Sequence, residues 1–503
     1  MAGFDVAIVG YGPAGAVAAA LLGQAGLRVH VCDRLAGVYE IPRAIALDHE
    51  VMRTFQQLGV VDAVRPHTEP FTPSEWFGAD GQLIRRMTMV APPWPQGYTP
   101  SLVFTQPAVE RVLREHVATL PGVTVALGTT LTGLSQDDTG ATLTLQGPAG
   151  TPHTVRARWV IGCDGGASTV RSLVGIGLED LDFDEPWLVV DVRVNERGLA
   201  RLPATSVQYC EPGRPCTMVI GPGNHRRWEI SLKPGEDPQR AASDAGTWAL
   251  LSRFLQPDEG TLWRQAAYRF HALVAQTWRA GCVFIAGDAA HMQPPFLGQG
   301  MCQGLRDVAN LAWKLAAVQH GTVAGPAAQR LLDSYGHERQ AHVRELTSRL
   351  KHIGAIICER DAERARERDA RLLAECGGVV KDTPRQDVLP RLDRGLLAAA
   401  DSTGRGTLFP QPRLREGPLM DQRFGAGWRL VLDGTLPAPA LPADITGIDL
   451  GSTPEAEGAV AAWMQQHGCR AALLRPDHYV YGTATDAATL QGLLAERQAA
   501  LND

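Results

Sequence analysis

The chain has 503 residues, of which 45% are hydrophobic and 20% are charged, and this length suits about two or three domains with apolar cores. Its 54 acidic and 48 basic side chains give a net charge of −6, which argues against nucleic acid or an anionic membrane as a main partner. No apolar run approaches the roughly 18 residues of a membrane-spanning helix, and the N-terminus lacks the basic segment of a signal peptide. The nine cysteines include no C-x-x-C pair, so we expect a reduced, cytoplasmic protein.

The start of the chain predicts a strand, a tight turn, a helix and a second strand. Residues 6–9 and 27–31 are short apolar runs, and residues 14–22 carry the small side chains of a closely packed helix. This βαβ unit implies a parallel sheet. Residues 44–58 predict a helix with one apolar face, whereas the many prolines of residues 67–101 predict a loop-rich excursion.

Between residues 187 and 232 polar and apolar side chains alternate, which predicts a mostly antiparallel sheet inserted into the first domain. A buried strand at residues 282–286 then returns to the first domain, and helices, a Pro- and Gly-rich linker and a small α/β unit follow. The fold class is therefore α/β. The predicted segments are 1–75, 105–182 and 273–376 for the first domain, 76–104 and 183–272 for the inserted domain, 377–412 for the linker and 413–503 for the C-terminal unit.

The turn after the first predicted strand reads Gly10-Tyr11-Gly12-Pro13-Ala14-Gly15. Glycines here let the backbone approach a pyrophosphate, and the following helix N-terminus offers N–H groups and partial positive charge to it. Asp33, which ends the second strand, is placed to accept a hydrogen bond from a ribose hydroxyl. We therefore predict a dinucleotide site rather than a turn without a ligand. The predicted contacts are Gly10, Gly12, Pro13, Ala14, Gly15, Asp33 and Arg34.

Two later motifs favour a flavin nucleotide over a nicotinamide nucleotide. Asp164 opens Asp-Gly-Gly-Ala-Ser-Thr-Val-Arg, Asp288 lies in Gly-Asp-Ala-Ala-His, and each motif follows a predicted strand. A carboxylate at a strand end can hold a ribityl hydroxyl. The Pro- and Gly-rich turn at residues 294–301 can aim the N–H groups of the next helix at the flavin pyrimidine edge, where negative charge gathers on reduction.

The three motifs stand in the order found in the single-component, class A flavoprotein aromatic hydroxylases, which the chain resembles over roughly residues 4–350. Residues 294–315, 48–53 and 226–229 are most similar to the 3-(3-hydroxyphenyl)propionate hydroxylase branch. The resemblance implies a Rossmann-like FAD-binding domain of the p-hydroxybenzoate hydroxylase type. It also implies an inserted, mostly antiparallel β-sheet substrate domain and a C-terminal thioredoxin-like domain.

The resemblance carries further FAD contacts onto this sequence. Arg43 and Gln106 would contact FAD, Asp164 would lie near both the flavin and the incoming nicotinamide nucleotide, and Asp288 would bind the ribityl chain. Pro295 would line the oxygen-activation pocket. The residues carried over are Arg43, Gln106, Asp164, Gly287, Asp288, Pro295, Gly298, Gly300, Met301 and Cys302. Because family members often have Asn where Cys302 stands, we expect its backbone rather than its side chain to make the contact.

The reaction implied by the resemblance is hydroxylation of a phenol ortho to its hydroxyl group, for example of a 3-hydroxyphenyl alkanoate. NADH or NADPH reduces a tightly but non-covalently bound FAD, O2 adds to form a C4a-hydroperoxide, and the electron-rich ring attacks its distal oxygen. Asp33 bears on the FAD ribose and not on the choice of nicotinamide nucleotide. The expected partners are a small aromatic substrate, O2 and NAD(P)H, with a homodimer left open.

Four residues are candidates for the catalytic site. A base with a pKa near neutrality would assist loss of the phenolic proton, and His49 has that chemistry, although a structural histidine fits its core-facing helix equally well. Tyr209 either lies in the substrate-facing strand implied by the resemblance or on the sheet surface. Arg227 either pairs with a substrate carboxylate or is an exposed strand-end charge. Pro295 completes the set.

Other chemistries have weaker support in the sequence. His337 and His342 resemble a zinc helix, but they are five rather than four residues apart, so we expect no metal site. The C-terminal unit contains only Cys469, so thiol exchange is not expected there. A tailoring hydroxylase of a larger aromatic natural product, a flavin-dependent reductase and a flavin-binding redox sensor stay open as alternatives. A halogenase would need a Trp-rich G-W-x-W-x-I-P segment, which this sequence lacks.

Overall fold

The structure is a computed structural model that describes residues 3–502. Its first sheet runs five parallel strands in the order β18-β11-β1-β2-β8, and the short strand β17 pairs antiparallel with β18 at one edge. These strands are β1 (Phe4–Val9), β2 (Val29–Asp33), β8 (Val123–Leu127), β11 (Pro152–Gly162), β17 (Arg279–Ala280) and β18 (Val283–Ile285). Parallel strands are buried on both faces and therefore appear as continuous apolar runs. The predicted βαβ unit is confirmed.

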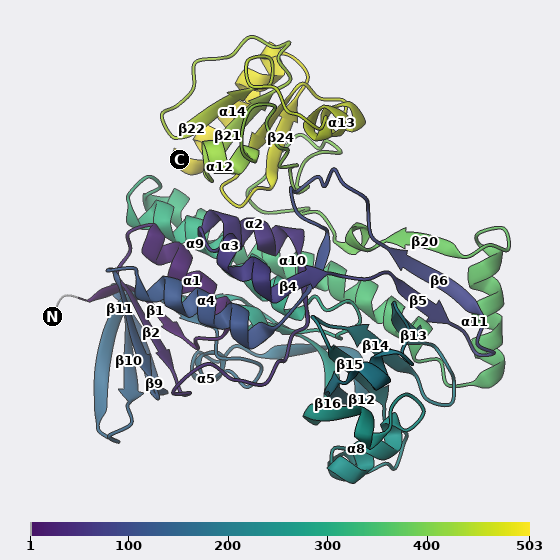
Figure 1. Ribbon diagram of the computed structural model, residues 1–503. Helices are drawn as coiled ribbons and strands as arrows, with labels where there is room; N and C mark the ends of the chain where they lie inside the picture. Colours follow the sequence, from purple (N-terminus) through teal and green to yellow (C-terminus); the bar gives the residue numbers. More distant parts are fainter. Residues whose placement is uncertain (1–2, 503) are drawn as a thin grey trace.

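Helices cover the parallel sheet, and a hairpin extends it. Helix α1 (Pro13–Gln24) packs against α9 (Gly300–Gln319) and α4 (Gln106–Ala118) on one face (Figure 1). Beyond Ala14, the alanines of α1 are fully buried, which lets these helices approach closely. The hairpin of β9 (Thr130–Asp137) and β10 (Gly140–Gln146) pairs antiparallel with β11.

The second sheet has nine strands in the order β19-β16-β12-β15-β14-β13-β5-β6-β20. Its central pairs β16-β12-β15-β14-β13 are all antiparallel, as the alternation between residues 187 and 232 predicted. The strands are β5 (Ser74–Phe77), β6 (Leu83–Thr88), β12 (Leu178–Val194), β13 (Ser206–Tyr209), β14 (Cys216–Ile220), β15 (His225–Ser231), β16 (Gly260–Ala275), β19 (His291–Met292) and β20 (Lys381–Pro384).

Two segments expected to be loop and linker supply strands to this sheet. The excursion at residues 67–101 contains the hairpin β5–β6, and the stretch 377–412 contains β20, which pairs parallel with β6. The prediction of a loop-rich excursion is wrong for these strands, because the prolines gather between residues 92 and 100, after the hairpin. Short strands with mixed polar side chains, such as Leu83–Thr88, carry too little periodicity to be recognised.

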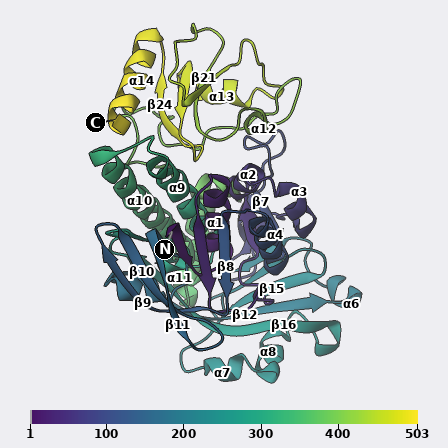
Figure 2. The same ribbon diagram turned by 90° about the vertical axis from the view of Figure 1, so that its left-hand side faces the viewer.

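The two faces of the nine-stranded sheet have different neighbours. On the outer face Val190, Met218, Trp228 and Ile230 pack under the short helix α8 (Asp244–Leu251). The opposite face, here called the inner face, faces the first domain: its Trp187 shares a cluster with apolar side chains of the loop before α9 and of α10. Figure 2 shows the sheet lying beneath the first domain, with α7 (Pro238–Ala241) and α8 below it.

Smaller elements complete the first domain. A three-stranded sheet has the order β3 (Ala46–Asp48), β7 (Ser101–Phe104) and β4 (Thr68–Pro70). In the chain, α2 (His49–Gln57) and α3 (Val61–Val64) lie between β3 and β4. The helix predicted at residues 44–58 thus begins five residues later, after the strand β3. The remaining helices here are α5 (Thr169–Leu173), α6 (Glu196–Leu199), α10 (Gly325–Ile357) and α11 (Ala362–Ala374).

The C-terminal unit is a four-stranded sheet in the order β22-β21-β23-β24, with β21 and β22 parallel and the other pairs antiparallel. It sits above α9, α2 and α3 (Figure 1). Its elements are α12 (Met420–Phe424), β21 (Trp428–Leu432), β22 (Ile445–Asp449), α13 (Ala459–Gln466), β23 (Ala471–Leu474), β24 (Val480–Ala484) and α14 (Ala487–Asn502). Within residues 3–502 no helix is both long and apolar enough to cross a bilayer.

Candidate functional site

The turn between β1 and α1 uses its glycines in two ways. A Cβ on Gly10, whose φ is +97°, would lie 2.3 Å from the Cys163 carbonyl oxygen, and one on Gly15 would lie 2.0 Å from the Gly10 carbonyl oxygen. Both glycines are therefore required by the protein's own packing. A Cβ on Gly12 would meet nothing within 4 Å. Gly12 thus borders open space at the N-terminus of α1, which begins with Pro13 and Ala14, where backbone N–H groups favour an anion.

Asp33 holds this turn in place. Its carboxylate accepts the backbone N–H of Tyr11 at 2.6 Å and that of Leu35 at 2.7 Å. Arg114 of α4 donates to the Tyr11 carbonyl oxygen at 2.6 Å, so the turn is fixed from both sides. Asp33 is half-buried and the neighbouring Arg34 is exposed, so both remain reachable from the open space at the end of β2.

The Asp-Gly-x-x-Ser-x-x-Arg motif ties two loops together. Asp164 accepts the backbone N–H groups of Thr169 at 2.7 Å and Val170 at 3.0 Å, and so caps the start of α5. Arg171 donates to the Gly166 carbonyl oxygen at 2.8 Å and to the Ala289 carbonyl oxygen at 2.9 Å. The motif therefore fixes the loop after β11 to the loop after β18. The hydrogen bonds of Asp164 and Arg171 described here hold the protein's own backbone.

The Gly287-Asp288 loop packs directly on α1. A Cβ on Gly287, whose φ is +61°, would lie 3.5 Å from the Ala14 Cβ. The Gly287 N–H donates to Asp307 at 2.9 Å, and His291 bonds the same carboxylate at 2.7 Å. Burial opposes ionisation of Asp307, but His291 and Arg339 outweigh it and lower the pKa of Asp307. Asp288 itself is exposed and has no hydrogen-bond partner among residues 3–502.

The loop before α9 brings backbone N–H groups to the same place. The Gly298 N–H donates to the Pro295 carbonyl oxygen at 2.7 Å, and a Cβ on Gly298 would lie 2.8 Å from the Ala46 Cβ. Gly300 borders open space and begins α9, and Met301 is half-buried in its first turn. Cys302 is fully buried, and burial raises the pKa of its thiol well above the usual value, so its side chain is an inert packing group.

A fourth segment faces these loops. The Gln106 side-chain oxygen accepts the N–H groups of Arg43 at 2.9 Å and Ala44 at 2.7 Å, while the Arg43 side chain is exposed. Gln106 thus shapes the backbone at residues 42–44. Together, the open space at Gly12, the free carboxylate of Asp288 and two partly exposed helix N-termini fit an extended dinucleotide with a planar ring. We call this edge, formed by residues 10–15, 163–168 and 287–302, the cofactor edge.

The inner face of the nine-stranded sheet carries a buried charge cluster. Asp191 of β12 accepts Arg227 of β15 at 2.7 and 3.0 Å and His225 at 2.7 Å. Burial opposes its ionisation, but Arg227 and His225 lower the pKa of Asp191. Arg227 also donates to the Arg43 carbonyl oxygen at 2.8 Å, and Arg264 donates to the Pro42 carbonyl oxygen at 2.7 Å. This cluster therefore joins the sheet to the segment that Gln106 shapes.

The structure corrects the description of Arg227. The side chain is buried, with 3% exposure, and makes four hydrogen bonds to Asp191, Arg43 and Pro42. It is therefore neither an exposed strand-end charge nor a guanidinium free to pair with a substrate carboxylate.

The structure also disfavours His49 and Tyr209 as catalytic groups. His49 is buried at the start of α2, and burial lowers its pKa to about 4, so it is a poor proton acceptor at neutral pH. Tyr209 packs against Phe254 and Phe77 with the outer-face cluster, on the side of the sheet away from the cofactor edge. Alternation along β13 places Gln208, rather than Tyr209, on the inner face.

Glu229 is an inner-face residue that the sequence reasoning passed over. It follows Arg227 by two positions on β15 and lies between Val189 of β12 and Thr217 of β14. The side chain is 8% exposed, and its carboxylate has no hydrogen bond within the described chain. Burial raises the pKa of Glu229 to about 7, although Arg227 pulls it down. Two sequence signals bore on it: the alternation of β15, which puts Glu229 on the face opposite the core residue Trp228, and the family resemblance of residues 226–229.

Asp307, Arg306 and Arg339 were also missed. Arg306 donates to Asp48 and Glu50 at 2.5 Å each and to Gln299 at 3.1 Å, so it supports the start of α9 from behind. Arg339 donates to Asp307 at 2.9 Å. Such long-range partners leave no local pattern in the sequence. No group of three or more His, Cys, Asp or Glu side chains in residues 3–502 is arranged to hold a metal ion.

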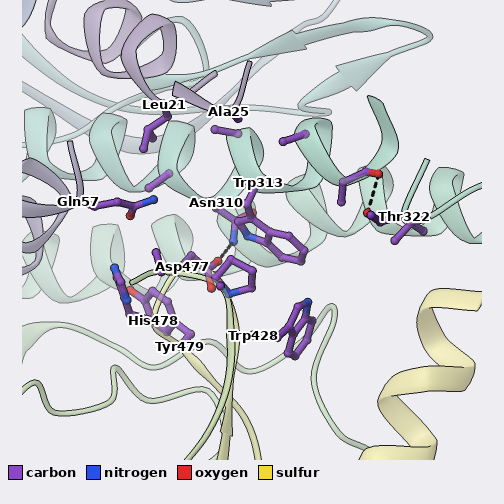
Figure 3. Close-up of a pocket in the computed structure, with 18 of the residues that line it drawn as sticks. Leu21, Ala25, Gln57, Asn310, Trp313, Thr322, Trp428, Asp477, His478 and Tyr479 are labelled. Carbon is purple, nitrogen blue, oxygen red and sulfur yellow. Dashed lines mark hydrogen bonds between the residues drawn. The ribbon is translucent and has the colours of Figure 1, made fainter. Parts of the chain in front are cut away.

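A cavity of about 450 Å³ lies elsewhere, between α9 and the C-terminal unit. Trp313, Trp428, His478 and Tyr479 line it, with Asn310 pointing toward Asp477 (Figure 3). None of the predicted cofactor or catalytic residues lines this cavity. It is a crevice between two units and not part of the cofactor edge.

Comparisons with known proteins identify the family of the chain and its fold. The sequence profile of a family described as "FAD binding domain" matches residues 3–350. The chain is 36% identical to a probable NADH-specific resorcinol 4-hydroxylase of Rhodococcus jostii (strain RHA1), over 99% of this chain and 95% of that protein. It is 32% identical to a 3-(3-hydroxy-phenyl)propionate/3-hydroxycinnamic acid hydroxylase of Burkholderia cenocepacia (strain HI2424), over 98% and 96%. The crystal structure of the flavin-dependent monooxygenase PieE with FAD and substrate shares the fold, with a TM-score of 0.81, 22% identity and 99% coverage of both chains.

Proposed function

The chain belongs to the FAD binding domain family of flavin-dependent aromatic hydroxylases, and on this premise we propose that it hydroxylates a small phenol next to the phenolic hydroxyl group, with O2 and a nicotinamide nucleotide as co-substrates. The observation that carries the proposal is the convergence of glycine-rich loops at the cofactor edge, opposite a buried sheet face that holds Glu229. FAD bound there would supply the two-electron chemistry that links the nicotinamide nucleotide to O2.

The residues of the cofactor edge would hold FAD without a covalent bond. Gly12 and the N-terminus of α1 suit the pyrophosphate, Asp33 suits the adenosine ribose, and Asp288 suits the ribityl hydroxyls. The N-terminus of α9 would face the flavin pyrimidine edge, where its N–H groups stabilise negative charge. The full proposed set is Gly10, Gly12, Pro13, Ala14, Gly15, Asp33, Arg34, Arg43, Gln106, Asp164, Gly287, Asp288, Pro295, Gly298, Gly300, Met301 and Cys302.

The proposed substrate is a phenol with a second polar group at the meta position. Resorcinol and 3-(3-hydroxyphenyl)propionate, named for the relatives, share that pattern. Arg227 and Arg264 are occupied by Asp191 and Pro42, but Arg385 is available. It donates to the Leu297 carbonyl oxygen at 2.7 Å and stacks on Phe71 at 4.1 Å, and no carboxylate of the described chain lies within 4.0 Å of it.

Arg385 would therefore bind the meta substituent. Burial lowers its pKa to about 10, so it still carries its charge at neutral pH. A guanidinium binds a carboxylate with two hydrogen bonds and a phenolic hydroxyl with one. The site can thus accept either a second hydroxyl or an acidic side chain, and the size of the pocket decides between them.

NADH is the proposed reductant. The relative with 36% identity is named as NADH-specific, and it covers nearly the whole chain. The inner face does not favour NADPH, because Arg227 and Arg264 are engaged with Asp191 and with backbone carbonyl groups. A free arginine pair would have suited the additional phosphate of NADPH.

We also propose that the segments predicted from the sequence act as an FAD domain, an inserted substrate domain and a thioredoxin-like C-terminal domain without thiol chemistry. The strand order of the C-terminal sheet supports this, and its Cys469 is buried and unpaired. Tyr479 of this unit donates to Glu50 at 2.9 Å, and Glu50 accepts Arg306. The C-terminal domain would thereby brace the start of α9.

The test is to load the purified protein with FAD and follow NADH and NADPH oxidation, O2 uptake and products with resorcinol, 3-(3-hydroxyphenyl)propionate and phenol. We expect one meta-substituted phenol to accelerate NADH oxidation and to yield a product heavier by one oxygen atom. If no phenol accelerates flavin reduction and no hydroxylated product forms, the proposed function is wrong. Oxidation of NADH with release of hydrogen peroxide alone would instead support the flavin-dependent reductase.

A further inference from the structure

We propose that Glu229 is the catalytic base that receives the proton of the substrate's phenolic hydroxyl group. This inference rests on the proposed hydroxylation of a phenol and adds the residue that activates the ring. Three observations carry it: the direction in which Glu229 points, the lack of any partner for its carboxylate, and the full occupation of the neighbouring charges.

The direction follows from the alternation of β15. Trp228 and Ile230 pack into the outer-face cluster under α8, so Arg227 and Glu229 project from the inner face. Arg227 reaches the carbonyl oxygens of residues 42 and 43, which flank the cofactor edge. Glu229 lies one pleat further along the same face and therefore faces the space between the sheet and the first domain.

Apolar clusters flank Glu229 on both sides along the inner face. Trp187, two positions before Val189 on β12, shares a cluster with Phe296 and Leu297 of the loop before α9. Val219, two positions after Thr217 on β14, shares another with Phe71 and Ala46. Glu229 thus lies between two apolar groups contributed jointly by the sheet and the cofactor edge, which suits a flat aromatic ring.

The carboxylate of Glu229 is unusual in being buried without a partner. Buried carboxylates are normally paired or hydrogen-bonded, as Asp191 is by Arg227 and His225. No side chain or backbone group of residues 3–502 donates to the carboxylate of Glu229. Its oxygens are also not sealed from accessible space, unlike the orphaned buried atoms of Trp187 and Trp228 beside it. A group held in this way is ready to bond a ligand.

The charged and titratable groups beside Glu229 on the inner face are engaged with one another: Asp191 binds both Arg227 and His225, and burial lowers the pKa of His225. On its own strand Arg227 is committed to Asp191, and on β16 Arg264 is held by the Pro42 carbonyl oxygen. The lateral neighbours Val189 and Thr217 are uncharged. From the segment after α11, Arg385 contacts the Leu297 carbonyl oxygen and the Phe71 ring. Burial holds the pKa of Glu229 at about 7, which suits a base acting near neutral pH.

The proposed step is a single proton transfer. The O–H bond of the phenol breaks, the proton moves to a carboxylate oxygen of Glu229, and the electron pair remains on the phenolic oxygen. The resulting phenolate is richer in electrons at the ortho carbon, which is the carbon that receives oxygen. Glu229 returns the proton to water when the product leaves, so the residue is unchanged over the cycle.

The test uses the FAD-loaded enzyme and the variants Glu229→Gln and Glu229→Asp, with resorcinol as the probe. In the oxidised enzyme, the ultraviolet difference spectrum of bound resorcinol reports phenolate without any turnover. We expect wild type to show phenolate that increases as the pH rises through about 7. Glu229→Gln should bind neutral resorcinol throughout that range, and Glu229→Asp should restore part of the phenolate signal.

Turnover supplies the second readout. We expect Glu229→Gln to lower kcat for hydroxylation about 100-fold, to remove the pH dependence near 7 and to change KM less than threefold. A Glu229→Gln enzyme that keeps the wild-type phenolate spectrum and pH profile would overturn the inference while leaving the proposed function intact. If wild type itself hydroxylates no phenol, both fail together. Glutamine matches the shape of the protonated acid, and a normal flavin absorbance spectrum would confirm that the variant is folded.

Discussion

The cofactor edge and the inner face of the nine-stranded sheet, the two proposed ligand sites, are built by different means. The cofactor edge is built from backbone: Gly12 leaves open space, and the starts of α1 and α9 present N–H groups. The inner face is built from side chains that meet across β12, β15 and β16. A backbone site needs a short run of particular residues, whereas a side-chain site needs only that distant strands come together. A backbone site can therefore be recognised in the sequence, whereas a side-chain site can be recognised only in the folded structure.

The sharpest test of the backbone site compares two glycines of one turn. Gly10→Ala places a Cβ 2.3 Å from the Cys163 carbonyl oxygen at a φ of +97°, so we expect a loss of at least about 3 kcal/mol in unfolding free energy. Gly12→Ala meets no protein atom, so the FAD-free protein should keep its stability within about 0.5 kcal/mol. Its FAD Kd should nevertheless rise at least about tenfold.

Denaturant titration of the FAD-free proteins and fluorescence titration with FAD would measure these two effects. The division into a packing glycine and a ligand glycine is wrong if Gly12→Ala destabilises the FAD-free protein as much as Gly10→Ala does. It is also wrong if Gly12→Ala binds FAD as tightly as wild type.

Glu229 offers a matching test of the side-chain site, through stability rather than activity. Its pKa in the folded protein, about 7, lies above the ordinary value of 4.5. Folding therefore favours the protonated acid, and wild type loses stability as the pH rises from about 4.5 to 7, after which the loss is constant. Glu229→Gln cannot titrate, so its unfolding free energy relative to that of wild type should rise by about 3 kcal/mol between pH 4.5 and 7.

Thermal denaturation of both FAD-saturated proteins between pH 4.5 and 8 would show the divergence. A constant difference between wild type and Glu229→Gln across this range would mean that Glu229 has an ordinary pKa. The unpaired carboxylate would then have a partner in solution, and the contrast with Asp191 would disappear.

The same contrast explains which sequence predictions succeeded. The Gly10–Gly15 turn and the Gly287-Asp288 loop could be recognised because each packs a whole function into a few adjacent residues, and the parallel strands because burial on both faces makes them apolar throughout. The two readings of Tyr209 stayed open in the sequence because a two-residue period predicts alternation but not which face meets the ligand. The structure decides it: Tyr209 packs on Phe254, just after α8, in the outer-face cluster, and Gln208 is left on the inner side.

Charge pairing was equally hidden from sequence. Arg227 and Asp191 lie 36 residues apart, and Arg306 and Glu50 lie 256 residues apart. No local sequence pattern therefore predicts either ion pair. The strand β20 was missed because its partner β6 lies some three hundred residues earlier in the chain. Side-chain sites depend on such contacts between residues distant in the sequence. The cofactor could therefore be predicted from the sequence, whereas the proposed base Glu229 could not.

Arg385 tests whether the side-chain site extends to the meta position of the ring. Arg385→Gln removes the only proposed cation for that substituent, so we expect the KM for resorcinol to rise about tenfold, equal to about 1.4 kcal/mol, with kcat nearly unchanged. Phenol, which lacks the second group, serves as the control substrate and should keep its KM. If both KM values rise equally, Arg385 supports the pocket rather than binding the substituent.

The smallest predicted effect concerns the link between the C-terminal unit and the cofactor edge. Tyr479 donates to Glu50, and Tyr479→Phe removes that hydrogen bond, but Glu50 keeps its ion pair with Arg306. We therefore expect a loss of only about 1 kcal/mol in stability and less than a threefold rise in the FAD Kd. Tyr481→Phe is the matched control, because the Tyr481 hydroxyl makes no hydrogen bond within residues 3–502. A rise above tenfold for Tyr479→Phe would mean that the cofactor edge depends on side chains of the C-terminal unit as strongly as on its own backbone.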